Sequence, residues 1–238
     1  DDEFAALWRD MTVARIVTFG LGAKADFTAR DVRAGVESAG FVTRFTLCTP
    51  GGEIAVVLHL AGKHNVINAL GAAAAAMAAG ATLADVAAGL ARMRAVGGRL
   101  QWRAGLQGAS LIDDSYNANP SSMHAAIDVL ESLAGRRWLV MGDMAELGSY
   151  AVEAHAEAGR YARAHGVERM FAIGALTPHA VKSFGAGAEW FADAAALAAA
   201  VARELAPDVR ILVKGSRMNR LERVVESLTA TLPAARSA

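Results

Sequence analysis

The chain has 238 residues, 54% of them hydrophobic, and equal numbers of basic and acidic side chains, so its net charge is zero. This length accommodates one large or two modest domains with real cores, and the neutral balance gives no indication of a polyanionic partner such as nucleic acid. The single cysteine, Cys48, excludes an internal disulfide framework and fits a reducing compartment. Charges and glycines interrupt the alanine-rich runs, so no segment resembles a signal peptide or a membrane span, and we expect a cytoplasmic protein.

The first part of the chain is expected to hold short strands and two helices. The turn residues Thr49-Pro50-Gly51-Gly52 separate two apolar segments and predict a hairpin. Gly80 is expected to end the first helix, and Thr82 to cap the second. The expected strands are residues 15–19, 41–47 and 54–60, and the expected helices are residues 65–79 and 83–94. Because the sequence opens with Asp1 and not methionine, so close to a strand, we interpret it as a fragment or a processed product.

The second part alternates regularly between apolar strands and helices. The expected strands are residues 110–113, 138–141, 170–173, a short one near 190, and 210–213. The expected helices are residues 120–133, 152–165, 178–183, 194–205 and 221–228. Repeated strand–helix units with apolar strands predict an α/β fold with a mostly parallel sheet and helices on both faces.

The two parts meet near residue 98, which predicts domains of residues 1–98 and 99–238. Val96-Gly97-Gly98 follows the end of a helix and precedes Arg99. Two glycines in that place predict a hinge, and an arginine beside it can reach a phosphate or an acid across a cleft. An ordinary surface arginine explains Arg99 equally well.

Three polar residues open the first long helix. His64, Asn65 and Asn68 lie in its first turn, and the two asparagines, three residues apart, project from one face. A carboxamide both donates and accepts hydrogen bonds, as adenine recognition requires. The simpler interpretation is that Asn65 caps the helix, that Asn68 faces solvent, and that His64 packs or caps.

Several polar residues follow the first strand of the regular region. Asn119 and Pro120 are explained as the start of a helix. The residues left unexplained are Asp113, Asp114, Tyr116 and Asn117. They lie outside the carboxyl end of a strand, where open sheets bind ligands, and the acids could hold Mg²⁺, orient ribose hydroxyls or pair with basic groups. Adjacent strand residues point in opposite directions, so we expect only one aspartate to line the site, and Asp114, further out of the sheet, is the better candidate.

Two further polar loops follow strands at the same expected edge of the sheet. One contains Asp143 and Glu146, and the other contains Lys214, Ser216 and Arg217 near a helix start, which suits an anionic group. Each loop alone is best explained as a solvated turn. Three polar loops at one edge together favour a ligand cleft.

The segments GKHNVINA, GGRL, LIDDSYNANP, MGDMAELG and LVKGSR, in this order and spacing, resemble the Mur ligases of bacterial cell-wall synthesis. DDSYNANP together with GDMAELG resembles the members that add D-alanyl-D-alanine and not a single amino acid. The resemblance covers essentially the whole chain. It implies the second half of a central ATPase domain followed by a complete C-terminal Rossmann-like domain.

The resemblance also implies a domain and motifs of the family that no segment of this sequence matches. The family has a UDP-binding domain, a glycine-rich phosphate loop and Mg²⁺ ligands, but no segment here fits G-x-x-x-x-G-K-[ST], since His64 follows Gly62-Lys63. The implied cofactors are ATP and Mg²⁺, with no metal ligand in this chain. The implied partners are UDP-MurNAc-tripeptide and D-alanyl-D-alanine, without nucleic acid, and the expected state is a monomer.

The implied reaction is ATP-dependent amide formation. The tripeptide carboxylate attacks the γ-phosphate to give an acyl phosphate, which the amine of D-alanyl-D-alanine then attacks. Such a reaction depends on positioning and on charge neutralisation. Because the groups that neutralise the transferred phosphoryl find no match here, we expect the 238-residue chain by itself to be inactive.

Residue roles are implied where positions match the family motifs. The residues implied to contact ATP are His64, Asn65, Asn68, Arg99, Asp114 and Tyr116, of which Arg99 and Asp114 are the catalytic pair. The residues implied to contact the acceptor or the dipeptide are Asn117, Asp143, Glu146, Lys214, Ser216 and Arg217.

Interpretations from other classes stay open. A sister ligase, such as a folylpolyglutamate synthetase or another Mur ligase, would apply the same chemistry to a different acceptor. A nucleotide-binding module would use the same site without catalysis. An NAD-dependent oxidoreductase is disfavoured, because no G-x-G-x-x-G follows the first strand of the regular region.

Overall fold

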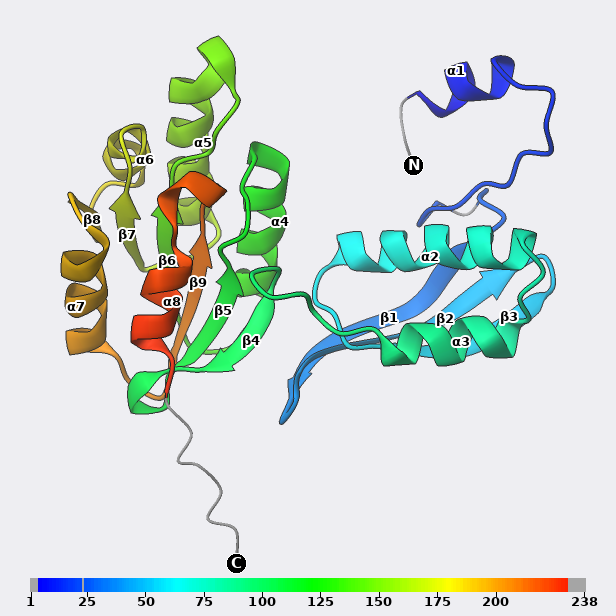
Figure 1. Cartoon of the computed structure of the whole chain (residues 1–238), viewed down its shortest axis with the longest axis horizontal. Helices are drawn as coiled ribbons and strands as arrows, with labels where there is room; N and C mark the ends of the chain where they lie inside the picture. The colour runs from blue at the N-terminus through cyan, green and yellow to red at the C-terminus, as the bar shows by residue number, and fades with distance from the viewer. Residues whose placement is uncertain (1–3, 23, 231–238) are drawn as a thin grey trace, which may run out of the picture. The chain divides into compact units, whose positions relative to one another are not determined.

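The computed structural model describes residues 4–22 and 24–230, and the chain divides into two compact units, Asp1–Ala95 and Val96–Ala238 (Figure 1). Arg94 forms a β-bridge with His59 of the first unit, whereas the carbonyl oxygen of Gly98 accepts a hydrogen bond from the amide of Tyr116 in the second. Residues 95–97 therefore connect the two. This connection shares Val96 and Gly97 with the proposed hinge. Hinge motion stays a prediction, as does the assignment of a function to each domain.

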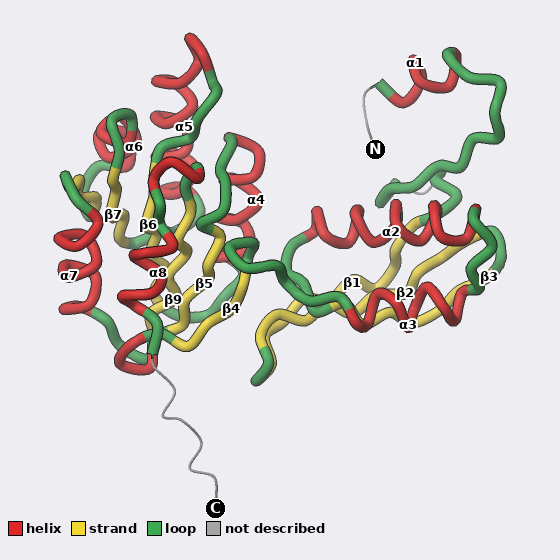
Figure 2. Tube along the Cα trace, viewed as in Figure 1, coloured by secondary structure: helices red, strands yellow, loops and turns green. Residues whose placement is uncertain are grey.

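Unit 1 is an antiparallel sheet with two helices packed on it (Figure 2). A short helix, α1 (Ala5–Asp10), precedes it. The strands, in the order β1-β2-β3, are β1 (Thr28–Glu37), β2 (Gly40–Thr49) and β3 (Gly52–Leu58). The helices are α2 (Lys63–Ala78) and α3 (Leu83–Arg92). Their inner residues, such as Leu70 and Leu90, share one core with Leu47 and Leu58 of the sheet.

The hairpin and both helices of unit 1 are confirmed, but one strand prediction is wrong and one strand was missed. Residues 15–19 form no strand, because Asp26 accepts hydrogen bonds from the amide and hydroxyl of Thr18 and folds the segment into a loop. Only the isolated bridge between Phe19 and Phe27 remains there. Strand β1 was not predicted, since its outer residues are mostly exposed and a register shift near Asp31 (φ +55°) interrupts the alternation of apolar residues.

Unit 2 contains a mixed sheet, whose strands among the described residues follow the order β4-β5-β9-β6-β7-β8. They are β4 (Gln101–Ala104), β5 (Ser110–Asp114), β6 (Arg136–Gly142), β7 (Arg169–Ile173), β8 (Ala188–Phe191) and β9 (Val209–Lys214). All pairs are parallel except β4 with β5. The predicted mostly parallel sheet is confirmed. The edge strand β4 was missed because four residues carry too short a pattern to detect.

Helices cover both faces of this sheet (Figure 1). They are α4 (Pro120–Glu131), α5 (Ala151–Ala164), α6 (Thr177–Phe184), α7 (Ala194–Glu204) and α8 (Glu222–Leu228). Helices α7 and α8 pack Val201 and Val224 against sheet residues that include Trp138, Phe171 and Ile211. Helices α4, α5 and α6 contact one another in sequence and lie on the other face. None of the helices among the described residues has the length and apolar character needed to cross a membrane.

The start of α4 forms as its sequence predicts. The Asn119 Oδ1 accepts a hydrogen bond from the amide of Ser122 at 2.8 Å, and Ser122 Oγ accepts one from the amide of Asn119 at 3.0 Å. This reciprocal arrangement is a capping box, and Pro120 occupies the first helical turn, where a missing amide hydrogen costs nothing. The cap fixes where the loop after β5 ends and α4 begins.

Candidate functional site

The polar residues of unit 1 gather in the first turn of α2. Asn65 Nδ2 donates to the carbonyl oxygen of Ala61 at 2.7 Å and lies 3.2 Å from His64 Nε2. Asn68 Nδ2 donates to Asn65 Oδ1 at 3.4 Å. The N-cap position belongs to Gly62 (φ +87°), so the simpler interpretation of Asn65 as the cap is wrong. The structure brings the three residues together, and their contact with adenine stays a prediction.

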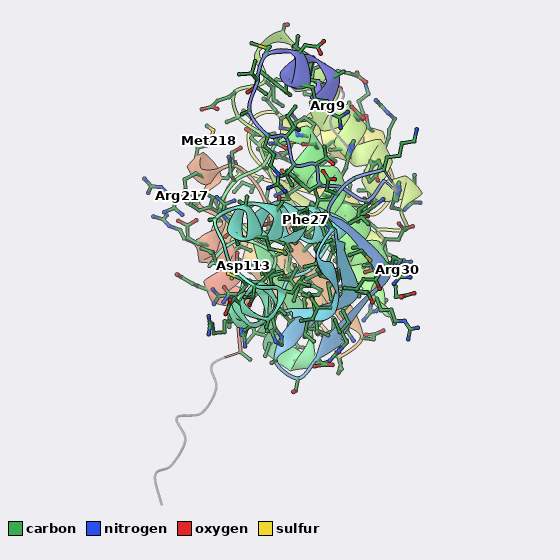
Figure 3. All side chains as sticks on the ribbon, turned by 90° about the vertical axis from the view of Figure 1, so that its right-hand side faces the viewer. Arg9, Phe27, Arg30, Asp113, Arg217 and Met218 are labelled. Carbon is green, nitrogen blue, oxygen red and sulfur yellow. The ribbon has the colours of Figure 1, made fainter. Side chains whose placement is uncertain are left out.

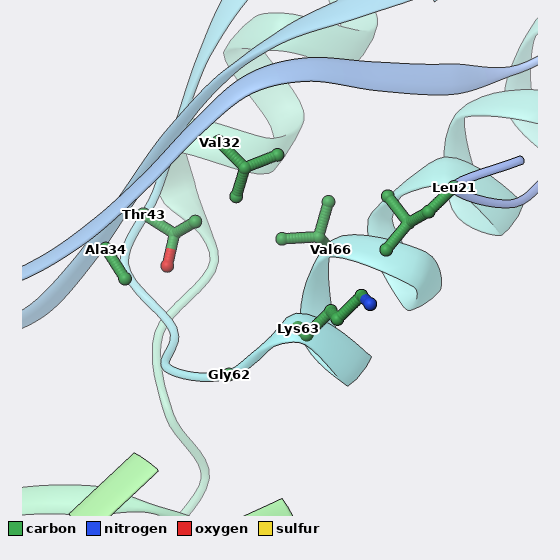
Figure 4. Close-up of a pocket in the computed structure, with 7 residues that line it drawn as sticks. All are labelled: Leu21, Val32, Ala34, Thr43, Gly62, Lys63 and Val66. Carbon is green, nitrogen blue, oxygen red and sulfur yellow. The ribbon is translucent and has the colours of Figure 1, made fainter. Parts of the chain in front are cut away.

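A cavity of about 270 Å³ lies beside this helix start (Figure 4). It is lined by Leu21, Val32, Ala34, Thr43, Gly62, Lys63 and Val66. The hydroxyl of Thr43 is already used, because it donates to the carbonyl oxygen of Leu60 at 2.8 Å. A mostly apolar lining does not suit a phosphate, and neither Asn65 nor Asn68 faces the cavity, so we do not assign it to a nucleotide.

In unit 2 the polar loops leave three neighbouring strands at one edge. Strand β9 lies between β5 and β6, and all three run parallel. Residues 115–119, 143–148 and 215–219 therefore begin at the same, carboxyl, edge of the sheet. The expected convergence of the three loops is confirmed, at the place where open α/β sheets bind ligands.

Asp114 and Lys214 form a buried ion pair at this edge. Lys214 Nζ donates to Asp114 Oδ2 at 2.6 Å and to the carbonyl oxygen of Asn117 at 2.9 Å, and Lys214 is only 2% exposed. Asp114 Oδ1 accepts a hydrogen bond from the amide of Leu100 at 3.1 Å. Leu100 has φ +48°, a left-handed conformation that is strained for a bulky side chain. Asp114 therefore helps to hold a strained turn directly after Arg99.

Asp113 has a different set of partners. Its Oδ1 accepts hydrogen bonds from the hydroxyl of Ser115 at 2.6 Å and from the amide of Ser115 at 3.2 Å. Its Oδ2 lies 3.2 Å from Arg103 Nη2. The two aspartates thus point apart, as strand alternation predicts, and Asp113 braces the turn that leads to Tyr116.

Two arginines flank the ring of Tyr116. The guanidinium carbon of Arg99 lies 4.5 Å from the ring centroid, and that of Arg217 lies 5.9 Å from it. Tyr116 is 46% exposed, and Figure 3 shows Arg217 and Met218 at the molecular surface. Among the described residues, neither guanidinium has a carboxylate within ion-pair distance. This cationic cluster is therefore available to an anionic ligand.

The cluster depends on a close backbone approach between Gly98 and Tyr116. Gly98 has φ +73°, and a Cβ there would lie 3.1 Å from both the amide nitrogen and the Cβ of Tyr116. A side chain at that position would push the Arg99 turn away from the ring. The glycine that the sequence marked as a hinge therefore also has a packing role inside unit 2.

The carboxylate of Asp143 is turned into the protein. It accepts hydrogen bonds from the amides of Ala175, Leu176 and Thr177 at 2.8, 2.9 and 3.0 Å, and so it caps the start of α6. Asp143 is 7% exposed. These bonds assign Asp143 to positioning α6, and its contact with the incoming amine stays a prediction.

Glu146 and Asn117 are placed differently. Both side chains are exposed on their loops. Glu146 has φ +61°, which is uncommon outside glycine and asparagine, and such strain is often kept at functional sites. Their proposed contacts with the substrate fit this placement.

Lys214 and Ser216 are buried, and their contact with the dipeptide stays a prediction. Ser216 is 3% exposed; its Oγ donates to the carbonyl oxygen of Ala118 at 3.1 Å and accepts from the amide of Ala145 at 2.8 Å. Both side chains are used within the protein. Asn219, which no sequence motif singled out, joins the same network through bonds to Asp143.

A buried histidine, also missed, supports the loop after β6. His155 is fully buried, and its Nε2 accepts a hydrogen bond from the amide of Met144 at 2.9 Å. Its Nδ1 lies 2.6 Å from the carbonyl oxygen of Ala151, which can only accept. Nε2 thus acts as an acceptor and Nδ1 as a donor in this pair of contacts. A helical histidine carries no sequence signal for such a role.

Together, a sheet with helices on both faces and a cluster of cationic and polar loops at its carboxyl edge define an α/β protein with a candidate ligand site at that edge. Comparison with protein families identifies the family within this class. Residues 98–217 match the model described as "Mur ligase, glutamate ligase domain", and residues 1–76 match the "Mur ligase middle domain". The chain belongs to the Mur ligase family.

Curated relatives and solved structures agree with this assignment. The UDP-N-acetylmuramoyl-tripeptide–D-alanyl-D-alanine ligase of Escherichia coli K12 is 45% identical over 208 residues, which are 87% of this chain and 45% of the relative. The Bacillus subtilis 168 protein of the same name is 35% identical over 218 residues, 89% of this chain and 46% of the relative. A crystal structure of MurF from Acinetobacter baumannii matches with TM-score 0.85 and 31% identity, over 96% of this chain and 50% of that one. The chain thus spans about half the length of the relatives it matches.

Proposed function

We propose that this chain supplies the C-terminal domain and part of the central domain of an ATP-dependent ligase in the cytoplasm. The ligase would join D-alanyl-D-alanine to UDP-MurNAc-tripeptide in peptidoglycan precursor synthesis. The observation that carries the proposal is the cationic cluster of Arg99, Tyr116 and Arg217 beside the Asp114–Lys214 pair. The names of the relatives with 45% and 35% identity support this choice of substrates.

The side chains at the carboxyl edge would act by positioning and by charge. Arg99 and Arg217 would face the negative charge of the phosphoryl group, the acyl phosphate or the dipeptide carboxylate, because guanidinium groups bind such oxygens in pairs. Both arginines lie close to the ring of Tyr116, which brings the two positive charges to one place. Glu146 and Asn117, exposed on neighbouring loops, would contact the incoming dipeptide. The proposed roles thus fall on exposed residues, and buried ones hold them in place.

The ATP-facing part of unit 1 would be the start of α2. His64, Asn65 and Asn68 lie together there and offer amide groups to an adenine ring. A MurF ligase from Thermotoga maritima, which shares the fold with TM-score 0.78 and 23% identity, has been crystallised in complex with ADP. That protein shows a nucleotide in this fold, and the contacts in this chain are a proposal.

The acids of this edge do not fit a Mg²⁺ site. Asp114 is 2.6 Å from a lysine ammonium, and Asp113 is 3.2 Å from an arginine, so a divalent cation there would meet positive charge. Another group with metal-ligand spacing, Asp128, Glu131 and His165, lies at the C-terminal ends of α4 and α5. Those helix ends are at the opposite edge of a parallel sheet. We therefore derive no step through a metal held by these residues.

The test uses a full-length ligase in which this chain replaces the matching part of the Escherichia coli relative. ATP-dependent phosphate release is measured with UDP-MurNAc-tripeptide and D-alanyl-D-alanine, together and separately. We expect release only when both are present. Release driven by a single amino acid would identify a sister ligase, and nucleotide binding without release would identify a binding module.

A pair of arginine variants links this activity to the cluster. Arg99→Ala should lower kcat/KM by about 30- to 1,000-fold, the equivalent of about 2–4 kcal/mol for a charge-assisted contact. Arg223→Ala, at another exposed arginine of unit 2, is the matched control and should have little effect. Equal losses in the two variants would remove the cluster from the proposed site.

A further inference from the structure

The loops of the carboxyl edge are fastened to one another by two side chains from the loop after β9. We propose that Ser216 and Asn219 form a loop lock, which holds the loops after β5 and β6 in place before any ligand binds. Neither residue touches substrate in this proposal; both are positioning residues. The catalytic consequence rests on the proposed ligase function, whereas the lock itself can be tested without it.

Ser216 connects three loops through one hydroxyl group. Its Oγ donates to the carbonyl oxygen of Ala118, in the loop after β5, and accepts from the amide of Ala145, in the loop after β6. A hydroxyl offers one hydrogen, so the donor is fully used. Ser216 is 3% exposed, so water is poorly placed to replace either bond.

Asn219 extends the sheet by one residue with its side chain. The β6–β9 ladder ends at Met141 and Lys214. Beyond it, the amide of Asp143 donates to Asn219 Oδ1 at 3.2 Å, and Asn219 Nδ2 donates to the carbonyl oxygen of Asp143 at 2.9 Å. The carboxamide thus pairs with both backbone groups of Asp143, whose carbonyl oxygen also accepts a hydrogen bond from the amide of Ser216 at 2.8 Å. Asn219 Nδ2 also donates to the carbonyl oxygen of Ser216 at 3.0 Å and joins the two parts of the lock.

Two glycines make room for this arrangement. A Cβ at Gly142 would lie 2.8 Å from Cγ of Asn219, and a Cβ at Gly215 would lie 2.9 Å from Cα of Gly142. Real Cβ atoms do not approach so closely, so the loops after β6 and β9 can meet only where both residues are glycine. The close approach is independent of the hydrogen bonds and supports the same conclusion.

The lock places the exposed side chains that the proposed reaction needs. Ala118 follows Tyr116 and Asn117 in one loop, and Ala145 precedes Glu146 in the next. Fixing the backbone at Ala118 and Ala145 therefore limits the positions that these neighbouring side chains can reach. Pre-organisation of this kind reduces the entropy lost when a substrate binds and reacts.

The first experiment measures amide hydrogen exchange by NMR in the 238-residue chain without ligands. Ser216→Ala should lower the protection of the Ala145 amide about tenfold, since a net hydrogen bond is worth about one decade in an equilibrium constant. The amide of Leu212, in the buried strand β9, should keep its protection and so report that the fold persists. Ser227→Ala is the matched control, because its hydroxyl bonds only within α8, to the carbonyl oxygen of Arg223.

Asn219→Asp tests the second half of the lock, because it changes the hydrogen-bonding groups of the side chain and leaves the shape of the side chain nearly unchanged. The variant keeps an oxygen for the amide of Asp143 but turns another oxygen toward the carbonyl groups of Asp143 and Ser216. Protection of both the Asp143 and Ala145 amides should fall. If Ser216→Ala does not fold, this variant, at a half-buried position, decides the question. Unchanged protection in the folded variants would overturn the lock, whatever the enzyme's activity.

The second experiment measures kinetics in the full-length hybrid ligase. The lock holds the loops after β5 and β6, which carry the residues proposed to contact ATP and the dipeptide. Ser216→Ala should therefore lower kcat/KM about tenfold or more for ATP and for D-alanyl-D-alanine alike. A rise in the KM of the dipeptide alone, with the Ala145 amide still protected, would make Ser216 a direct contact and overturn its positioning role. If the unaltered hybrid shows no ligase activity, the proposed function fails, and the exchange data still judge the lock.

Discussion

The start of α2 in unit 1 and the carboxyl edge in unit 2 are built in opposite ways. At α2, the bonds of Asn65 and Asn68 reach partners three or four residues away along the chain. At the carboxyl edge, Lys214 bonds to Asp114 and Asn117 across 100 and 97 residues, and Ser216 bonds to Ala118 across 98. The first region needs little more than its helix, whereas the second exists only when the whole sheet has formed.

This difference separates the effect of a substitution on stability from its effect on ligand binding. At the helix start, polar side chains are partly exposed and can be changed without disturbing a core. At the carboxyl edge, the side chains that hold the loops are buried, and removing one leaves its partner without a hydrogen bond or a counter-charge. Substitutions at the start of α2 should therefore change ligand binding with little effect on stability, whereas substitutions of the buried residues at the carboxyl edge should also lower stability.

The largest expected effect is at the buried ion pair. Lys214→Met should destabilise unit 2 by about 3–5 kcal/mol, because the carboxylate of Asp114 stays buried without a counter-charge. Urea unfolding of the 238-residue chain measures this loss. Lys63→Met, at an exposed lysine of α2, should change stability by less than about 0.5 kcal/mol. Adding Asp114→Asn to Lys214→Met should recover part of the loss, and a further loss of similar size would contradict the pairing.

The two adjacent aspartates give the next prediction. Asp114→Asn should impair ATP use in the full-length ligase far more than Asp113→Asn, by roughly 30- to 1,000-fold, because Asp114 holds the turn after Arg99. Both carboxylates are buried and paired, so unlike solvated loop acids they also contribute to stability. Steady-state kinetics are therefore measured at a temperature where circular dichroism shows both variants folded. Equal, small losses would exclude Asp114 from the site.

A smaller effect is expected at the strained loop after β6. Glu146→Gly should stabilise unit 2 by about 1 kcal/mol, since glycine adopts φ +61° without strain. Glu146→Gln should leave stability unchanged but raise the KM for the dipeptide, because it removes only the charge. Thermal unfolding and kinetics on the same two variants measure both effects. A loss of stability in the glycine variant would show that the side chain supports the loop.

The smallest expected effect is local and lies in unit 1. Hydrogen bonds from the hydroxyl and the amide of Thr82 hold the pKa of Asp85 below its ordinary value of 3.8 in the capping box of α3. Because the pKa of Asp85 is lower in the folded state, its carboxylate stabilises the folded state at pH values above the unfolded-state pKa. This stabilisation is lost as the pH falls through the folded-state pKa. Asp85→Asn should therefore flatten the acid limb of the unfolding curve of unit 1. NMR of α3 amides between about pH 2 and pH 5 measures it, and an unchanged acid limb would contradict the assignment.

Much of the fold could be predicted because its signals are local. The βα alternation after residue 98, the hairpin before β3 and the cap at Asn119 each depend on neighbouring residues. Strand β1 escaped prediction because most of its side chains are exposed, and β4 because it is short. The segment at residues 15–19 has strand-like residues, but Asp26 satisfies its polar groups in a loop.

The sequence by itself determined the α/β class, the family resemblance and the candidate loops, because periodicity, caps and motif spacing are properties of short segments. Only the tertiary structure decided which polar residues are exposed and which are buried. Lys214, Ser216 and Asp143 were predicted as ligand contacts, and the structure shows that all three are buried and bond to other parts of the protein. The physical reason is that a polar group inside a fold must find a partner, and that partner can lie a hundred residues away in the chain, where no local pattern records it.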